Sequence, residues 1–438
     1  MLKKLIRSAA GAHVPHHKNT ADMPTVQMPV PAKIVVPMQM HIGAPCECVV
    51  KKGDTVYVGT LLGKATGFVS ADIHSGVSGT VDGMDTVQFA AGNKAEAVVI
   101  IPDGKQTPDP AIKAPTVTNH EELVAAVRAC GLVGLGGAGF PTAVKLSPKN
   151  LDQIDTLVVN GAECEPYITA DNREFLENAD LIFAGLDAVK THLHIARVII
   201  AIERNKPAAI DAMYAAIKGK EGYLVQPLPS VYPQGAEKVL IKKTTGREVP
   251  RGGLPSDVGV VVMNVSTAAV LGKYLTTGMP LTTKRLTVDG DAVAEPKNVE
   301  VIIGTLYEDV IQFCGGYKTE AAKVLAGGPM MGSAQLSTNA PVVKQNNAIL
   351  VFSEKLAHLP DSSACIRCGK CIHACPMGLA PVEIANAYEK RDAAMLDKLM
   401  VDLCMQCGCC SYVCPAKLPL AQKMALAKIV QKEAKSNG

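Results

Sequence analysis

The sequence contains no tryptophan, only seven phenylalanines and only ten tyrosines. With so few aromatic side chains, a stacking surface for single-stranded nucleic acid is not expected. The net charge is only +3 and no block of lysines and arginines is present, so nucleic acid is not an expected partner. The best apolar run, residues 259–271, is shorter than the roughly 18 residues of a membrane span and contains Asn264, Ser266 and Thr267. The charged segment that begins at Met1 lacks the apolar core of a secretory signal, so we expect neither a signal peptide nor a transmembrane helix.

Cysteine is abundant, and eight of the 14 cysteines form two copies of one spacing near the C-terminus. Each copy reads Cys-x2-Cys-x2-Cys-x3-Cys-Pro, which is the spacing that binds a pair of 4Fe–4S clusters, the fourth cysteine of each copy ligating the cluster of the other. Structural zinc also uses Cys-x2-Cys pairs, but it needs neither the third cysteine nor the Cys-Pro. The predicted ligands are Cys365, Cys368, Cys371 and Cys414 for cluster 1, and Cys404, Cys407, Cys410 and Cys375 for cluster 2.

The 438 residues are enough for three or four domains, and 48% of them are hydrophobic. Changes in residue pattern predict a multidomain chain of α/β and β type. Cluster cysteines must be reduced when iron arrives, which favours the cytoplasm. The predicted parts are an extended N-terminal arm (1–31), an all-β domain (32–101), a Pro-rich linker (102–117), an α/β domain (118–275), a domain of short strands with one helix near 306–314 (276–352), and a helical two-cluster domain (355–438).

The all-β segment contains short Val and Ile runs separated by glycines, with two strands around Lys52-Gly53-Asp54. It resembles the barrel-sandwich hybrid of biotinyl and lipoyl domains. At the hairpin tip that would carry the modified lysine, the sequence has Asp72, Ile73 and His74. We therefore expect an unmodified structural or docking module.

A Gly-rich segment opens the α/β domain soon after a helix that we expect to begin at a capping box at Thr118 and to end at Gly131. The segment 131–145 has glycines that allow close backbone approach, Pro141 suited to the first position of the next helix, and Lys145 one turn further on. Such a loop directs backbone N–H groups at a phosphate. Glycines also serve tight packing, so the loop alone is weak support for a nucleotide site.

Four segments in order resemble the flavoprotein subunit of respiratory complex I: Gly-x-Gly-Gly-Ala-Gly-Phe-Pro-Thr from Gly134, Asn-Gly-Ala-Glu-Cys-Glu-Pro from Asn160, Tyr-Pro-Gln-Gly-Ala-Glu from Tyr232, and Met-Asn-Val-Ser-Thr from Met263. The resemblance implies an FMN site and a nicotinamide nucleotide site. The FMN residues that it implies are Gly134, Gly136, Gly137, Lys145, Asn160, Glu163, Tyr232, Gly235, Glu237, Asn264 and Thr267, and the NADH residues are Phe140, Glu165 and Arg251. Glu165 and Glu237 are expected to position the reactants and not to act as acid or base.

The sequence departs from that family at several of these segments. Ala162 and Ala236 stand where the family has acidic residues, Met263 replaces an asparagine, and Leu254 replaces an aromatic nucleotide contact. Fewer carboxylates are therefore expected around the flavin.

The whole chain resembles the C subunits of the Rnf ion-translocating ferredoxin:NAD+ oxidoreductases. The resemblance rests on the arm 11–15, on residues 202–207, 253–257 and 327–332, and on the doubled cysteine pattern. It implies the domain order barrel-sandwich hybrid, flavoprotein-like Rossmann-type α/β domain, β-grasp (SLBB-like) domain and α-helical ferredoxin domain.

The resemblance implies that electrons pass between ferredoxin, two 4Fe–4S clusters, FMN and NAD+/NADH, because FMN exchanges hydride pairs for single electrons. It also implies other Rnf subunits as partners, including membrane-embedded subunits that couple the reaction to ion transport and a ferredoxin-like iron–sulfur subunit. Ferredoxin itself would act only indirectly, and the chain would lie on the cytoplasmic side of the membrane. Two alternatives remain open: a soluble relative that feeds a cytosolic reductase, and a relay without NADH activity.

Overall fold

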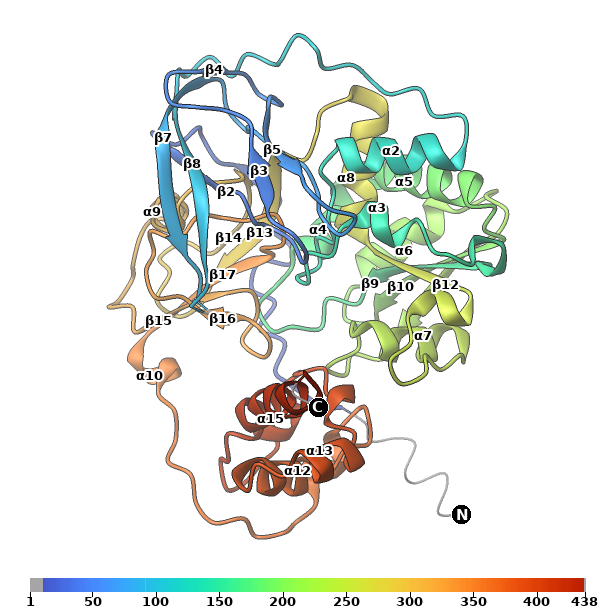
Figure 1. Ribbon diagram of the computed structural model, residues 1–438, viewed down its shortest axis with the longest axis vertical. Helices are drawn as coiled ribbons and strands as arrows, with labels where there is room; N and C mark the ends of the chain where they lie inside the picture. Colours follow the sequence, from blue (N-terminus) through green and yellow to red (C-terminus); the bar gives the residue numbers. More distant parts are fainter. Residues whose placement is uncertain (1–10, 91, 437–438) are drawn as a thin grey trace.

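The computed structural model describes residues 11–90 and 92–436. Figure 1 shows two β-rich domains beside an α/β domain, with a helical domain below them on a long connecting segment. The predicted fold class is therefore confirmed. No helix in the described part of the chain is long and apolar enough to cross a membrane.

The barrel-sandwich domain consists of two small antiparallel sheets, in the orders β2-β8-β7-β4 and β3-β5-β6. At the hairpin tip, Asp72, Ile73 and His74 are buried, and the Asp72 carboxylate accepts from Lys64 Nζ at 2.7 Å. The residues at the position of the modified lysine are thus part of the core of this domain. The strands are β2 (Ile34–Pro37), β3 (Cys46–Cys48), β4 (Thr55–Val56), β5 (Leu61–Ala65), β6 (Ile73–His74), β7 (Gly79–Gln88) and β8 (Lys94–Pro102).

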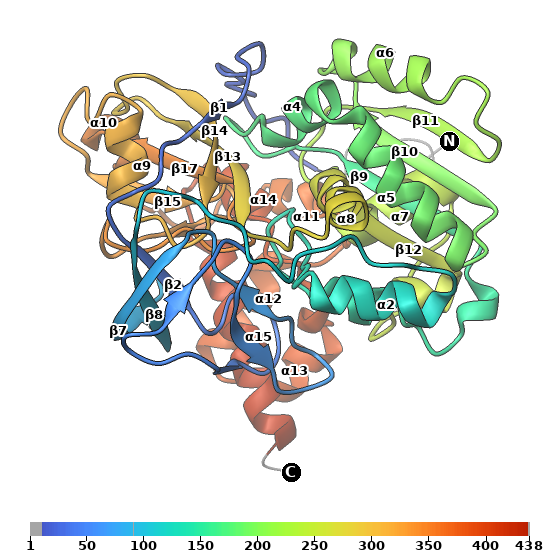
Figure 2. The ribbon, with the colours of Figure 1, turned by 90° about the horizontal axis from the view of Figure 1, so that it is seen from above.

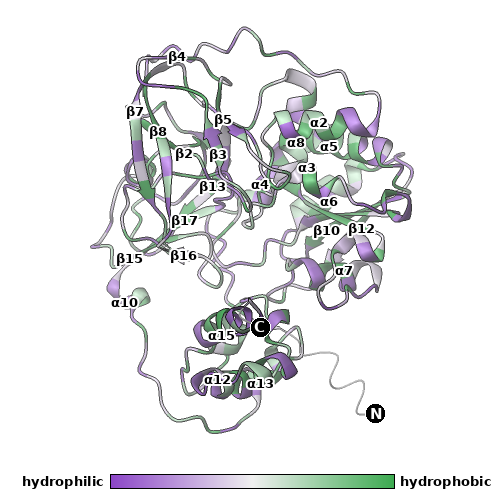
Figure 3. Cartoon of the chain, viewed as in Figure 1, coloured by the Kyte–Doolittle hydropathy of each residue, from purple (hydrophilic) through white to green (hydrophobic). Residues whose placement is uncertain are grey.

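The parallel-sheet domain has four parallel strands in the order β11-β10-β9-β12. β9, β10 and β12 are almost fully buried because helices cover both faces, as expected for parallel strands. Figure 3 shows apolar colour along β10 and β12, whereas α7 at the edge is largely hydrophilic. The strands are β9 (Thr156–Gly161), β10 (Arg197–Glu203), β11 (Tyr223–Leu228) and β12 (Val260–Asn264). The helices are α2 (His120–Ala129), α3 (Thr142–Lys145), η2 (Leu151–Gln153), α4 (Ala170–Glu177), α5 (Ala179–His192), α6 (Pro207–Ala216), α7 (Glu237–Thr245), η3 (Pro255–Val258) and α8 (Val265–Thr277).

Two helix starts differ from the sequence-based expectation by one residue. α2 begins after Asn119, whose side chain accepts from Glu122 N at 2.9 Å, while Thr118 N donates to the Glu122 carboxylate at 2.7 Å. Thr118 therefore lies one residue before the cap, because Asn119 is an equally good capping residue. Pro141 is the N-cap of α3 and not its first helical residue, since its ψ of 121° is extended.

The mixed-sheet domain has the strand order β1-β14-β13-β17-β15-β16. Its first strand, β1 (Val26–Gln27), belongs to the N-terminal arm and pairs in parallel with β14. The expected helix is present as α9 (Tyr307–Phe313). The other strands are β13 (Thr283–Asp289), β14 (Lys297–Ile302), β15 (Lys323–Ala326), β16 (Ser333–Ala334) and β17 (Ala348–Phe352).

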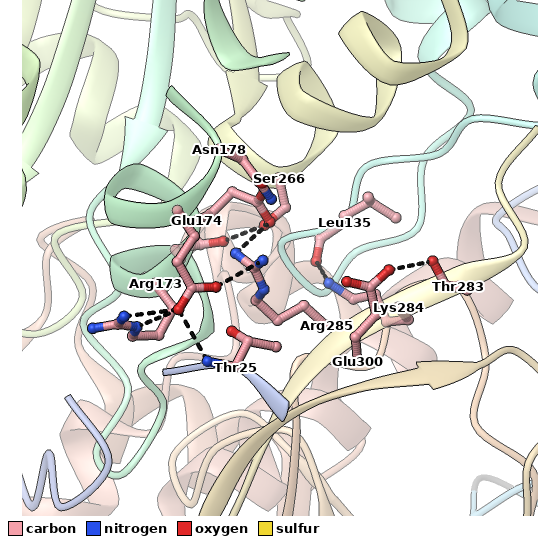
Figure 4. Close-up of polar contacts among 12 residues, drawn as sticks. Thr25, Leu135, Arg173, Glu174, Asn178, Ser266, Thr283, Lys284, Arg285 and Glu300 are labelled. Atoms are coloured by element: carbon pink, nitrogen blue, oxygen red, sulfur yellow. Dashed lines mark hydrogen bonds and ion pairs between the residues drawn. The ribbon is translucent and has the colours of Figure 1, made fainter. Parts of the chain in front are cut away.

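Buried ionic groups join the mixed-sheet domain to the parallel-sheet domain (Figure 4). Arg285 on β13 lies between Glu174 and Glu177 of α4, at 3.2 and 3.0 Å. Its neighbour Lys284 donates to the carbonyl of Leu135 at 3.3 Å, in the Gly-rich segment. A buried ion pair costs several kcal/mol when one partner is lost, so these contacts fix one domain against the other.

The cysteine-rich domain is helical, as expected. Its short α11 and α14 each contain the third cysteine of a motif, and α12 begins with Pro381 at its first position. The predicted helical connection between the motifs is present as two helices separated at Arg391, where φ is 52°. The helices of this region are α10 (Glu354–Ala357) in the connecting segment, then α11 (Lys370–Ala374), α12 (Pro381–Glu389), α13 (Ala393–Lys398), η4 (Val401–Leu403), α14 (Cys409–Tyr412) and α15 (Leu420–Ser436).

From residue 11 onward the N-terminal arm contains no helix, and a turn at residues 19–23 interrupts its extended course; the expectation for residues 1–10 lies outside the described residues. The histidines of the described arm do not converge on a metal site. His16 Nδ1 lies 3.4 Å from Asn205 Nδ2, and His17 stacks on Tyr167.

Candidate active site

The candidate site lies at the point where the strand order of the parallel sheet reverses. β9 is followed by β10 on one side, whereas β12 returns to pair with β9 on the other side. Ligands bind at such a point, beyond the carboxyl ends of the strands. Asn160, next to the end of β9, and Asn264, the last residue of β12, are register partners, although 104 positions separate them. The strand order therefore brings two of the predicted FMN residues together.

A cavity of about 880 Å³ opens at this edge. All four domains line it, including Phe89 from the barrel-sandwich domain, Gly328 from the mixed-sheet domain and Cys404 from the cysteine-rich domain. The predicted residues that line it are Gly134, Gly136, Gly137, Phe140, Lys145, Asn160, Glu163, Glu165, Tyr232, Gly235, Glu237 and Asn264.

Thr267 does not line the cavity and instead anchors the Gly-rich segment. Its Oγ1 accepts from Leu135 N at 3.0 Å. The same segment is held by Lys284 Nζ at the Leu135 carbonyl and by Ile42 N, which donates to Gly139 O at 3.1 Å. Three domains thus fix the loop that would receive a phosphate, and Thr267 acts through the loop backbone.

The asparagines and Gly235 form the floor of the cavity. Asn160 Nδ2 donates to Gly235 O at 2.9 Å, and its Oδ1 accepts from Ala162 N at 3.1 Å. Asn264 caps α8 through its Oδ1 and donates from Nδ2 to Asp171 Oδ2 at 2.8 Å. A methyl group at Gly235 would lie 2.3 Å from the Ala162 carbonyl, so this position accommodates only glycine.

Glu163 and Glu165 are the carboxylates with perturbed acidity. Burial raises the pKa of each to about 7. Glu163 Oε1 accepts from Asp171 N at 2.7 Å, whereas its buried Oε2 has no protein partner in the described structure. A buried orphan oxygen at the cavity wall fits a ligand that donates a hydrogen bond there, as an FMN or nicotinamide amide does.

Glu165 reaches the mixed-sheet domain. Its Oε2 accepts from Met330 N at 3.0 Å, and its Oε1 accepts from Met331 N at 2.9 Å. Tyr232 Oη lies 3.5 Å from Oε1. The carboxylate therefore holds the 327–332 loop over the cavity.

Lys145 and Glu237 pair with each other at 2.8 Å at the cavity wall. Both side chains are partly exposed. A phosphate at the Gly-rich segment would compete with Glu237 for this ammonium group.

Arg251 is placed outside the cavity wall. Its guanidinium donates to both Asp402 carboxylate oxygens, at 2.8 and 2.6 Å, and to Asp397 Oδ1 at 3.0 Å. These pairs join the parallel-sheet domain to the cysteine-rich domain. A nucleotide contact for Arg251 stays a prediction.

The two cysteine motifs have the same backbone geometry. Arg367 N donates to Cys365 Sγ at 3.4 Å, and Gln406 N donates to Cys404 Sγ at 3.4 Å. Arg367 and Gln406 also share a positive φ, 55° and 57°. N–H···S bonds of this kind stabilise and tune iron–sulfur clusters. The sequence repeat is thus a structural repeat.

The fourth cysteine of the first motif lies with the second motif. A small cavity is lined by Cys375 together with Cys404, Cys407 and Cys410, the four predicted ligands of cluster 2. Burial raises the pKa of the Cys371 thiol, and the nearby Cys414 and Cys365 sulfurs raise it further. Cys414 of the second motif therefore lies near Cys371, a predicted cluster 1 ligand of the first motif.

The cysteine pattern itself argues against zinc, because a zinc site needs neither the third cysteine nor the Cys-Pro. The four predicted ligands of cluster 2 come from both motifs and line one small cavity, as crossed ligand sets require.

Two features of the site were not predicted from the sequence. Asp171 on α4 lines the cavity and connects Glu163, Asn264 and Ser266 through hydrogen bonds. Lys18 of the arm donates to three carbonyls of the 163–168 segment. Neither residue lies in a motif, so no local signal identifies it.

Comparisons with known proteins match the chain domain by domain. The family models that match are the RnfC barrel sandwich hybrid domain over residues 6–105, the Nuo51 FMN-binding domain over 127–273, the SLBB domain over 285–334 and the 4Fe-4S dicluster domain over 358–415. The chain thus has an FMN-binding domain and an iron–sulfur domain. A solved NAD+-reducing [NiFe]-hydrogenase in its H2-reduced state shares the fold, with a TM-score of 0.52 and 19% identity over 74% of this chain and 64% of that chain.

Curated relatives cover most of the chain. It is 45% identical to the C subunit of the proton-translocating ferredoxin:NAD(+) oxidoreductase complex of Clostridium ljungdahlii, over 83% of this chain and 80% of that protein. It is 44% identical to the C subunit of the Na(+)-translocating ferredoxin:NAD(+) oxidoreductase complex of Acetobacterium woodii, over 89% and 88%. It is 41% identical to the C subunit of the ion-translocating oxidoreductase complex of Rhodobacter capsulatus, over 95% and 82%. The chain therefore belongs to the RnfC family, the C subunits of the Rnf ion-translocating oxidoreductase complexes.

Proposed function

We propose that this subunit passes electrons between NAD(H) and a one-electron partner in the order FMN, cluster 2, cluster 1. One observation supports this order. Cys404 lines both the large cavity at the sheet edge and the small cavity formed by the predicted cluster 2 ligands. Cluster 2 therefore adjoins the flavin site. The cluster 1 ligands Cys365 and Cys368 are exposed, so cluster 1 faces outward.

The side chains of this chain bind and orient the reactants. Bound FMN supplies the exchange between two-electron and one-electron steps. The Gly-rich segment and Lys145 would hold its phosphate, and Asn160 and Glu163 would meet its ring and ribityl chain. Glu165 and Glu237 would position the nucleotide, with Phe140 at its face.

Cluster 1 would serve the partner subunits. The segment 358–368, which carries Cys365, is exposed along its whole length and has no regular secondary structure. We infer that an iron–sulfur subunit of the complex docks here and relays electrons from ferredoxin. Because the relatives are subunits of ion-translocating complexes, we assign ion transport to membrane-embedded partners and place this subunit on their cytoplasmic side.

The order is tested by anaerobic reduction with NADH, observed by flavin absorbance and cluster EPR. In Cys404→Ser, which removes a cluster 2 ligand, NADH should reduce FMN but not cluster 1. In the matched variant Cys365→Ser, NADH should still reduce cluster 2. Reduction of cluster 1 in Cys404→Ser at the wild-type rate would contradict the order, and a wild-type flavin that NADH leaves oxidised would contradict the function.

A further inference from the structure

The N-terminal arm connects three domains at the candidate site. Gly11 N donates to Ala374 O of the cysteine-rich domain at 3.1 Å, and Ala12 pairs with Tyr232. Further along, the buried Thr20 Oγ1 lies 2.6 Å from Thr169 Oγ1, and Asn298 Nδ2 of the mixed-sheet domain donates to Thr20 O at 2.8 Å. Figure 1 shows this dark-blue segment running between the domains. Figure 2 shows it passing beside β14 and α4. The arm is therefore part of the site's framework.

Lys18 is the arm residue that contacts the functional segment. Its Nζ donates to the carbonyls of Glu163, Glu165 and Ile168 at 2.9, 2.8 and 2.5 Å. An ammonium group has three donors, and all three are used. Although the residue as a whole is only partly buried, its ammonium group is enclosed. The 163–168 backbone thus wraps around one cation, and both site carboxylates project from it.

Among the described residues, no carboxylate pairs directly with this cation. The neighbouring Lys206 donates to Glu163 O at 3.3 Å, but it is paired with the buried Glu203 at 3.2 Å. Burial lowers the pKa of Lys18 to about 8, so the ammonium group keeps its proton at pH 7. A positive charge that is poorly screened by water therefore lies behind the wall of the cavity.

We propose that Lys18 is a positioning residue of the flavin site, which fixes the 163–168 segment and supplies a buried positive charge that favours electron arrival at the flavin. The inference rests on the proposed function, because it assumes FMN in this cavity. Reduction adds negative charge to the flavin, and a nearby buried cation stabilises that charge. An uncharged residue at this position should lower the flavin midpoint potential.

The test is a spectroelectrochemical titration of the flavin at pH 7 in the holo chain. In Lys18→Met, we expect the ratio of reduced to oxidised flavin at a given potential to fall at least tenfold, which is about 30 mV for a two-electron couple. Thr20→Val removes an arm contact without changing the charge and should stay near wild type. Exposed Lys33→Met serves as the matched lysine control.

A second variant changes the charge in the opposite direction. Glu203→Gln leaves Lys206 without its carboxylate partner and should raise the flavin potential. A Lys18→Met protein that keeps its fold, its FMN and the wild-type potential would overturn the proposal. If Lys18→Met does not fold or retain FMN, an unchanged potential in Glu203→Gln would overturn it. A wild-type flavin that dithionite reduces but NADH does not would refute the proposed function alone.

Discussion

Replacing Glu165 by glutamine tests the energetic cost of a buried carboxylate at the site. Burial raises the pKa of Glu165 from 4.5 to about 7, while the Met330 and Met331 amides partly oppose this shift. Between these two pH values the folded chain holds a proton that the unfolded chain has released. The free energy of unfolding therefore falls as pH rises through this window and levels off above pH about 7. A difference of about 2.5 pH units corresponds to roughly 3 kcal/mol.

Glu165→Gln removes this titration. The Met330 and Met331 amides donate to different oxygens of Glu165, and glutamine replaces one of these oxygens by an NH2 donor, so the variant has a destabilising offset that does not depend on pH. The expected result is that the unfolding free energy of the variant, relative to wild type, increases by roughly 3 kcal/mol between pH 4.5 and pH 7.5. Glu163 titrates in both proteins, so its contribution cancels in the difference.

The measurement is urea unfolding of the FMN-free chain at several pH values, followed by circular dichroism. Glu221→Gln, at an exposed position, is the matched control and should show no such pH dependence. A difference between Glu165→Gln and wild type that stays constant with pH would refute the buried-carboxylate reasoning.

Three further predictions concern the clusters, the domain contact and the cavity floor. Cys375→Ser should lose cluster 2 and keep cluster 1 by EPR and iron content, although Cys375 belongs to the first motif; the opposite loss would contradict the crossed ligand sets. Arg251→Met should slow NADH-driven cluster reduction, because it removes the ion pair with Asp402 that joins the two domains, and high salt should reproduce the effect in wild type. Equal cluster reduction rates would exclude this role. Gly235→Ala places a methyl group 2.3 Å from the Ala162 carbonyl and should weaken FMN binding at least about tenfold in a fluorescence titration; unchanged affinity would move FMN elsewhere.

The cysteine pattern and the segments that resemble the complex I flavoprotein were enough to predict an iron–sulfur domain and an FMN-binding domain. The cysteine spacing is sufficient by itself, since a cluster loop needs its ligands at fixed short separations. Strands β9, β10 and β12 each contain a run of buried apolar residues, which is typical of a parallel strand. β11 lacks such a run, because its burial is mixed and Pro227 interrupts an otherwise β-forming segment.

Contacts between domains could not be predicted in the same way. Thr267 looks like a cavity residue by motif, but its hydroxyl group accepts from the loop backbone. Arg251 is a predicted nucleotide contact, and nothing in the sequence indicates that its guanidinium also pairs with two carboxylates more than 140 positions away. The specific partner of a charged side chain depends on how whole domains pack, and no periodicity in the sequence encodes that packing.

Lys18 shows how contacts between domains affect the interpretation of the site. Its neighbours are histidines and prolines, which are typical of an extended arm, and Lys18 lies directly before a turn at residues 19–23 of that arm. A lysine in such a segment would ordinarily be solvated. Here the carbonyls of Glu163, Glu165 and Ile168 converge on its ammonium group, about 150 positions away in the sequence. The motif residues therefore predict where FMN binds, whereas the buried charge that we propose beside the flavin belongs to a side chain outside every motif. A motif-by-motif comparison with the flavoprotein subunit of complex I would miss this residue, so the flavin potential of the two families cannot be assumed to be the same.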